Sequence, residues 1–163
     1  MKIHKILFST HGDDQGTLVA VEECKDIPFQ IRRVYYMYGT RCDVVRGRHA
    51  HRSLRQVLIC VHGSCKVRLD DGRERETVTL DRPSEGLYIS NAVWREMFDF
   101  SPDAVLLVLA SDLYDEEDYI RDYKDFLEYV KNQDHGEEYV KNRDYDEDYV
   151  KNHDHDEDQN EEA

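Results

Sequence analysis

The sequence predicts an all-β antiparallel sandwich or barrel, followed by a C-terminal helix and an acidic tail. Short runs rich in β-branched and aromatic residues recur with turn signals every 8–15 residues, a spacing typical of sandwiches and barrels. No helical period separates these runs before Ser111. We therefore expect about eight short strands in a domain of residues 1–130, and a separate tail at residues 131–163.

The expected strands follow one another along the chain. Residues 2–9 alternate weakly, and the turn sequence HGDDQG separates them from the apolar run 17–23. Pro28 pushes the residue before it into extended geometry and so ends that run. The later runs cover residues 31–39, 56–63, 65–80, 86–100 and 104–111. Within the run 65–80, Asp71-Gly72 predicts a two-residue hairpin turn.

Past Ser111 the apolar period becomes helical. A stripe of six apolar or aromatic residues follows the acidic residues 115–117, which suit a helix N-terminus; the stripe consists of Tyr119, Ile120, Tyr123, Phe126, Leu127 and Val130. We expect a helix of about four turns that packs on the sheet or on a partner subunit. The sequence Tyr-Val-Lys-Asn then starts at residues 129, 139 and 149 between acidic spacers. Such units have too few apolar groups to offset ordering entropy, so we expect disorder beyond about residue 132.

Charge and cysteine content limit the class of protein. The 163-residue chain carries a formal net charge of −14, and residues 131–163 hold 13 acidic against four basic residues. This acidity disfavours binding of nucleic acid. The four cysteines form no CxxC pair, and no apolar stretch approaches the ~20 residues that span a membrane. We expect a reduced, cytoplasmic protein.

The central motif is RGRHAHRSLRQVLICVHG, residues 46–63. His49 and His51 are two positions apart, so on a strand they project from one face. The spacing HxH, four residues, Gln56, six residues, Gly63 resembles the first motif of the cupin superfamily, which implies a jelly-roll β-barrel. In that motif a glutamate stands where this chain has Gln56, and it ligates a metal together with the two histidines.

The donor set of this chain departs from the cupin metal site. Gln56 supplies a neutral amide, and residues 86–100 contain no second-motif histidine. A divalent ion normally takes three or four protein ligands, so we expect no metal. We also expect no other cofactor. The histidines are then available for proton transfer, for which a pKa near 6.5 is well placed. The alternative is that they are structural and hydrogen-bonded inside the barrel.

An arginine-rich window surrounds this motif, with Asp43 the only acid between Arg32 and Arg55. Arginine binds phosphate in bidentate fashion. Strand alternation puts Arg33 and Tyr35 on the same face. If that face is inward, the pair supplies an anion ligand and a phenol. We expect Arg33 and Arg46 to be the anion ligands, the alternative being an ordinary solvated charge pattern.

Several stretches together closely resemble the dTDP-4-keto-6-deoxyglucose 3,4-ketoisomerases, which are cupin-fold enzymes. They are GTLVAVEECKDIPFQIRRVYYMYGT, the motif extended to RGRHAHRSLRQVLICVHGSCKVRLDDG, GLYISNAVWREMFDF and VLASDLYDEEDYIRDYKDFLEYV. The resemblance covers roughly residues 5–130. It implies a metal-independent isomerase that moves the ketone of the sugar from C4 to C3 through an enediol. His49 and His51 would transfer the protons, Tyr35 would hold the sugar or base, and Arg33 and Arg46 would bind the pyrophosphate.

The resemblance also implies a homodimer that exchanges its N-terminal strand. The product would supply a pyridoxal-phosphate aminotransferase making a 3-amino-3,6-dideoxy sugar for a surface glycan, such as a cell-surface polysaccharide, or for a glycosylated metabolite. Relatives commonly carry a basic residue where this chain has Gln15, so the configuration at C4 of the product stays open. Three alternatives also stay open: a dTDP-sugar 3,5-epimerase, whose RGxH stretch resembles residues 46–49, a metal-dependent cupin oxygenase, and a non-catalytic nucleotide-sugar-binding cupin.

Overall fold

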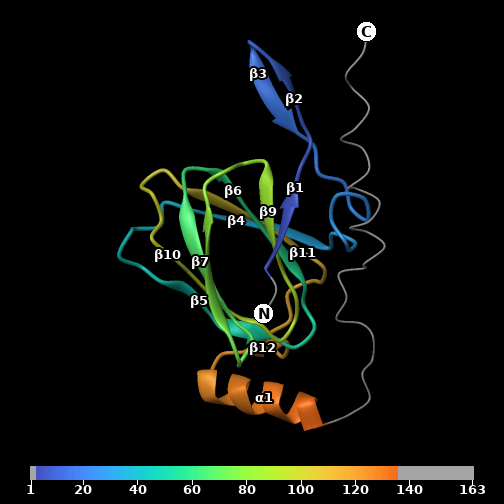
Figure 1. The fold of residues 1–163 in the computed structure, drawn as a ribbon, viewed down its shortest axis with the longest axis vertical. Helices are drawn as coiled ribbons and strands as arrows, with labels where there is room; N and C mark the ends of the chain where they lie inside the picture. Colours follow the sequence, from blue (N-terminus) through green and yellow to red (C-terminus); the bar gives the residue numbers. More distant parts are fainter. Residues whose placement is uncertain (1–2, 136–163) are drawn as a thin grey trace.

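The computed structural model describes residues 3–135, which contain twelve strands and one helix (Figure 1). The strands are β1 (His4–Leu7), β2 (Thr10–Asp13), β3 (Gly16–Val19), β4 (Arg33–Tyr38), β5 (Arg46–His51), β6 (Gln56–His62), β7 (Cys65–Asp70), β8 (Arg75–Leu80), β9 (Glu85–Ile89), β10 (Trp94–Phe98), β11 (Val105–Ala110) and β12 (Tyr119–Ile120). The helix is α1 (Tyr123–His135). The predicted all-β class with a C-terminal helix is confirmed.

Two five-stranded antiparallel sheets make the body of the protein. The first has the strand order β1-β9-β6-β11-β4, and the second has the order β12-β5-β10-β7-β8. This is the cupin-type jelly roll that the central motif implied. Strands β2 and β3 form a separate hairpin that projects away from the barrel (Figure 1).

Apolar side chains are buried in three layers. The main core lies inside the barrel and includes Leu58, Val67 and Leu106. Because β6 is central in its sheet, its alternate residues Val57 and Ile59 are also buried, in a second cluster that covers the outer face of the first sheet.

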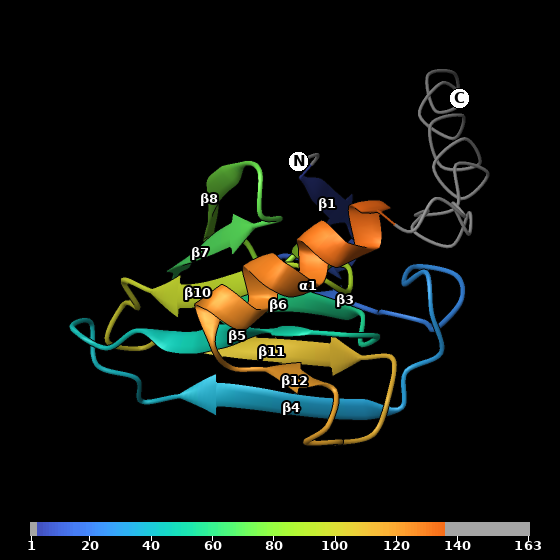
Figure 2. The same cartoon turned by 90° about the horizontal axis from the view of Figure 1, so that it is seen from below.

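The third apolar cluster joins α1 to the outer face of the second sheet. Phe126 and Val130 of α1 pack with Trp94 of β10, Ala50 of β5 and Ile120 of β12. Figure 2 shows α1 lying across this part of the barrel. The helix was expected to pack either on the sheet or on a partner subunit. The structure shows it packed on the sheet of its own chain.

Two local predictions were wrong. Tyr119 and Ile120 were expected to begin the helix, but they form β12, which pairs with His51 and Ala50 of β5. Backbone pairing at the open sheet edge thus outweighs the helical spacing of these side chains, and α1 begins at Tyr123. The turn between β7 and β8 is also longer than two residues, because the last cross-strand pair is Asp70 with Arg75.

The acidic tail lies mostly outside the described residues. The helix extends to His135, slightly beyond the point where disorder was expected. The second and third copies of Tyr-Val-Lys-Asn fall in residues 136–163, outside the described range. The boundary between domain and tail at residue 130 therefore stays a prediction.

All four cysteines have free thiols; Cys24 and Cys42 are exposed, whereas Cys60 and Cys65 are buried. Within residues 3–135, no helix has the length and apolar character needed to cross a membrane.

Candidate active site

A cavity of about 600 Å³ opens between β4, β5, β10 and the segment that leads into β12. Four of the five side chains expected at the site line it, namely Arg33, Tyr35, Arg46 and His49. The sequence left open which face of β4 points inward; in the structure Arg33, Tyr35 and Met37 are half-buried while the residues between them are exposed. The remaining lining includes Tyr114, Tyr119 and Arg121.

His51, the fifth expected residue, lies beside His49 but deeper in the protein. The two imidazole centroids are 4.9 Å apart and the rings are nearly perpendicular. The side chain of His51 is only 1% exposed, and its Nε2 has no hydrogen-bond partner among the described residues. Tyr119 packs against both rings, with centroids at 5.0 Å from His49 and 4.3 Å from His51. The pair therefore reaches the cavity through His49.

A β-bulge in β5 brings Arg46 to the same cavity as His49. Simple alternation would put these residues on opposite faces, because they are three positions apart. In the structure Arg95 pairs with His49 but Glu96 pairs with Gly47, so one residue of β5 is skipped. The skipped residue, Arg48, is exposed and has φ +57°.

The bulge depends on glycine at position 47. Gly47 has φ +85°, in the left-handed region that glycine occupies without strain. A Cβ at this position would lie 2.7 Å from the carbonyl oxygen of Arg95 and 3.2 Å from the Met97 sulfur. The RG dipeptide of the motif is therefore a structural requirement for placing Arg46.

Arg95 is a cation buried beneath the histidines. It is 1% exposed, and its Nε and Nη1 have no hydrogen-bond partner among the described residues. Burial lowers the pKa of its guanidinium to about 10, so it stays charged at neutral pH. Its Nη2 donates one long hydrogen bond, of 3.4 Å, to the carbonyl oxygen of Ser90.

This environment keeps both histidines neutral. Burial, followed by the charge of Arg95, lowers the pKa of His49 to about 4. The same two causes hold the pKa of His51 well below its usual range. Neutral imidazoles can accept protons, and they can do so at a pH where an exposed histidine would already be charged.

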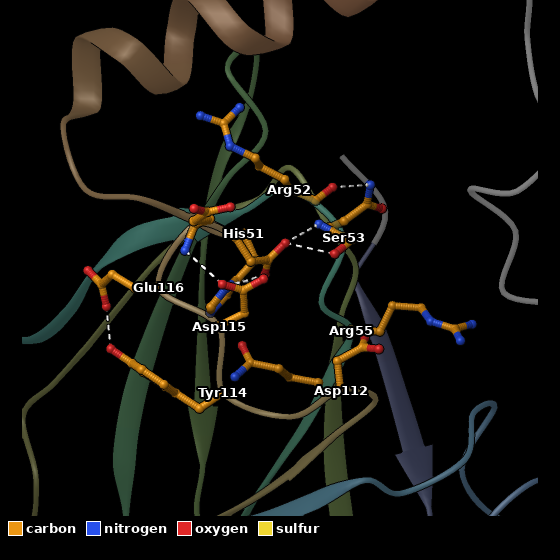
Figure 3. Close-up of polar contacts among 12 residues, drawn as sticks. His51, Arg52, Ser53, Arg55, Asp112, Tyr114, Asp115 and Glu116 are labelled. Atoms are coloured by element: carbon orange, nitrogen blue, oxygen red, sulfur yellow. Dashed lines mark hydrogen bonds and ion pairs between the residues drawn. The ribbon is translucent and has the colours of Figure 1, made fainter.

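His51 also contacts a carboxylate. Its Nδ1 lies 2.8 Å from Oδ2 of Asp118, which immediately precedes β12. Because burial and Arg95 disfavour the imidazolium, we interpret this contact as a neutral Nδ1–H that donates to the carboxylate. Figure 3 shows this region, with His51 at the end of β5, Ser53 just after the strand, and the segment from Asp112 to Glu116 beside them.

Gln56 has a hydrogen-bonding role in the position where cupins carry a metal ligand. Its Nε2 donates to the Tyr35 hydroxyl oxygen at 2.8 Å. An amide turned to present its NH₂ group does not offer a lone pair to a cation. Within residues 3–135, no three histidine, cysteine or acidic side chains are grouped so as to hold a metal ion. These donors do not fit the cupin metal site.

The arginines at the cavity differ in what holds them. Arg33 stacks between the rings of Tyr35 and Tyr114, with its guanidinium carbon 5.4 Å and 5.6 Å from their centroids. Arg121 is paired with Glu116 through two contacts, at 2.7 Å and 2.9 Å. Arg46 makes no ion pair with any side chain in the described part of the chain. Its charge is available to a ligand.

Sequence reasoning missed Arg95, Asp118 and the tyrosine pair Tyr114 and Tyr119. Arg95 had a signal that went unused, because it shares strand parity with Met97 of the core. Asp118 lies at the end of an acidic run that suited a helix N-terminus. Its partner is 67 positions away, and no local pattern indicates that contact.

Comparisons with known families and with solved structures agree with one another. A model of the family described as "WxcM-like, C-terminal" (FdtA) matches residues 1–131. A TDP-4-oxo-6-deoxy-α-D-glucose-3,4-oxoisomerase from Aneurinibacillus thermoaerophilus is 57% identical over 121 residues, which are 74% of this chain and 87% of that protein.

Solved structures give the same result. A 3,4-ketoisomerase from Helicobacter canadensis is 50% identical, with a TM-score of 0.78 over 80% of this chain and 98% of that one. A histidine-to-asparagine variant of the 3,4-ketoisomerase QdtA from Thermoanaerobacterium thermosaccharolyticum, solved with TDP-4-keto-6-deoxyglucose, is 47% identical. Its TM-score is 0.79, over 80% of this chain and 95% of that one.

Proposed function

The chain belongs to the WxcM-like, C-terminal (FdtA) family, and from this premise we propose that it is a nucleotide-sugar 3,4-ketoisomerase. Its substrate is TDP-4-keto-6-deoxyglucose, and the reaction moves the ketone from C4 to C3. The observation that carries the proposal is the pair of neutral histidines at the cavity, with ring centroids 4.9 Å apart. Relatives that share about half of the sequence are named for this activity.

The reaction needs two proton shifts, and the two histidines supply one each. A hydrogen leaves C3 and one is added at C4, while the hydroxyl hydrogen leaves O3 and one is added at O4. We assign the carbon-bound proton to His49, because it lines the cavity where the sugar ring would lie. We assign the oxygen-bound proton to His51. Each histidine returns to its neutral form, so the isomerisation is balanced and consumes no other reactant.

Charged and polar groups around the pair support this chemistry. Negative charge develops on oxygen as the C3 proton leaves, and the buried Arg95 cation lowers the cost of that charge. Tyr35 accepts a hydrogen bond from Gln56, so its own hydroxyl hydrogen is available to the sugar. Burial raises the pKa of Tyr35, which keeps that hydrogen in place at neutral pH.

The nucleotide end of the substrate is assigned to the arginines. Arg46 has no acidic partner in the described chain, and Arg33 is held in place by two aromatic rings. A pyrophosphate takes such guanidinium groups in bidentate fashion. We therefore assign Arg33 and Arg46 to the pyrophosphate, with Tyr35 at the sugar.

The test follows the carbonyl group by NMR while the protein acts on TDP-4-keto-6-deoxyglucose in D₂O. The expected result is loss of the C4 ketone and appearance of a C3 ketone. Deuterium at C3 and C5 without ketone migration would indicate a 3,5-epimerase. Binding of TDP without any turnover would indicate a non-catalytic binding protein. Either of the last two outcomes overturns the assignment.

We also propose that the protein is a cytoplasmic homodimer that acts in deoxysugar biosynthesis. The outer face of β4, an edge strand, exposes Val34, Tyr36 and Tyr38 by 55%, 62% and 72%. An apolar face of this kind is typical of a protein interface.

The turn containing Gln15 does not line the cavity of its own chain, so contact between Gln15 and a sugar requires a partner's cavity. Light scattering should give twice the 19.3 kDa chain mass, and a mass of one chain would overturn the proposal.

A further inference from the structure

The carboxylate of Asp118 is held on several sides. One oxygen, Oδ2, faces Nδ1 of His51 at 2.8 Å. The other, Oδ1, accepts hydrogen bonds from the backbone N–H of Ser53 at 2.8 Å and from the Ser53 hydroxyl at 2.7 Å. Dashed lines that start at Ser53 mark these two contacts in Figure 3. The backbone carbonyl of Asp118 also accepts the N–H of Arg52 at 2.9 Å. This carboxylate therefore has a single position relative to the imidazole.

A carboxylate fixed in this way decides where the imidazole hydrogen lies. An ionised carboxylate only accepts hydrogen bonds, so a contact at 2.8 Å requires the hydrogen of neutral His51 to be on Nδ1. Burial acts to raise the pKa of Asp118, but the hydrogen bonds from Ser53 and the contact with His51 outweigh it and lower the pKa, which keeps the carboxyl ionised. The other nitrogen, Nε2, is then the one with a lone pair, and it is buried without a partner in the described chain.

We propose that Asp118 is a positioning residue of the ketoisomerase site, which fixes His51 in the tautomer with hydrogen on Nδ1 and leaves Nε2 as its proton-accepting atom. The inference rests on the proposed function and adds to it the atom of His51 that takes part. No other carboxylate among the described residues hydrogen-bonds to the His51 ring. The other charged or titratable groups around the ring are His49, Arg95 and Tyr119.

The tautomer matters because Nε2 is the one nitrogen of His51 that does not contact Asp118 and can exchange a proton with the sugar. Nε2 accepts the hydroxyl hydrogen of O3 as the electron pair of that O–H bond forms the C3 carbonyl. His51 is then an imidazolium whose Nδ1–H faces the Asp118 carboxylate, and this contact offsets part of the charge. Nε2 returns the hydrogen to O4. With the opposite tautomer, Nε2 already carries a hydrogen and cannot accept another one.

The tautomer can be read directly in the resting protein. A two-bond ¹H–¹⁵N correlation spectrum of the full chain, without substrate, distinguishes a protonated from an unprotonated ring nitrogen. We expect His51 to show a protonated Nδ1 and an unprotonated Nε2 at neutral pH. A hydrogen on Nε2 in the unmodified protein would overturn the proposal. Since this measurement needs no turnover, its outcome is independent of whether the proposed function is correct.

The variant Asp118→Asn tests the consequence for turnover. The asparagine keeps the size of the side chain and an oxygen for Ser53, but it can turn its NH₂ towards Nδ1, which favours hydrogen on Nε2. We expect kcat to fall by about 10²–10⁴-fold, a loss of the size that accompanies a missing acid or base. KM should change little, because Asp118 does not line the cavity. Since an amide does not titrate, the deficit should persist at every pH.

A matched control comes from the same acidic run. Asp115 is exposed, and its Oδ1 accepts the backbone N–H of Glu117 rather than a group at the histidines. Asp115→Asn should keep the kcat and the His51 tautomer of the unmodified protein. A folded Asp118→Asn protein with undiminished kcat would overturn the proposal. If Asp118→Asn does not fold, the spectrum of the unmodified protein decides the question.

Discussion

Acid should destabilise this protein through His49, and the size of the effect follows from its environment. Burial and the charge of Arg95 lower the pKa of His49 from 6.5 to about 4. Below pH 6.5 the unfolded chain binds a proton at this residue while the folded chain does not, so stability falls as the pH falls towards 4. A shift of this size corresponds to about 3 kcal/mol in full. Between pH 7 and pH 5 the loss from His49 alone should be about 2 kcal/mol.

The assay is urea denaturation at both pH values for the unmodified protein and for His49→Asn. The variant lacks the titrating group, so its loss of unfolding free energy between pH 7 and pH 5 should be smaller by about 2 kcal/mol. His11→Asn replaces an exposed histidine of β2 and serves as the matched control. Equal losses in the unmodified protein and in His49→Asn would refute the claim that the folded site holds this imidazole neutral.

Four further predictions concern the site and the tail. His49→Asn and His51→Asn should each lower kcat by about 10²–10⁴-fold in the carbonyl assay, and retention of most activity by both would contradict their roles. Arg46→Met should raise KM for the nucleotide sugar more than it lowers kcat, and an unchanged KM would remove Arg46 from the pyrophosphate site. Gly47→Ala should lower the melting temperature and activity together, because its Cβ would meet the Arg95 carbonyl at 2.7 Å; a fully stable, active variant would show that the bulge is dispensable. Deleting residues 136–163 should leave steady-state turnover nearly unchanged, and a large loss would give the acidic repeats a role in the site.

Alternation along the strands was sufficient to predict the general form of the site. The period of two put His49 with His51 and Arg33 with Tyr35, because side chains two apart share a face wherever the strand is regular. Placing Arg46 in the same cavity required the bulge at residues 47 and 48. The glycine at position 47 is consistent with a bulge, but many glycines in strands are not at bulges, so the sequence alone could not establish it.

Contacts between distant segments could not be predicted in the same way. Tyr119 and Ile120 have helical spacing with the residues after them, yet they form strand β12, which pairs with the edge of β5. Asp118 then reaches His51, and the acidic run is divided between a site residue and solvent-exposed loop residues. Only the completed barrel brings these residues together. Arg95 is a similar case, since its burial depends on the histidines and tyrosines that surround it.

The contact between His51 and Asp118 also has a consequence for chain synthesis. It joins residues 67 positions apart, and the ribosome releases β5 well before β12. A nascent chain that ends before residue 118 lacks the carboxylate, even though every strand of the main barrel core has already been made. During synthesis, catalytic competence therefore depends on docking of the last strand, β12. Recovery of activity during refolding would then report the docking of β12, and so would burial of Trp94, which packs with Ile120 of β12 and Phe126 of α1.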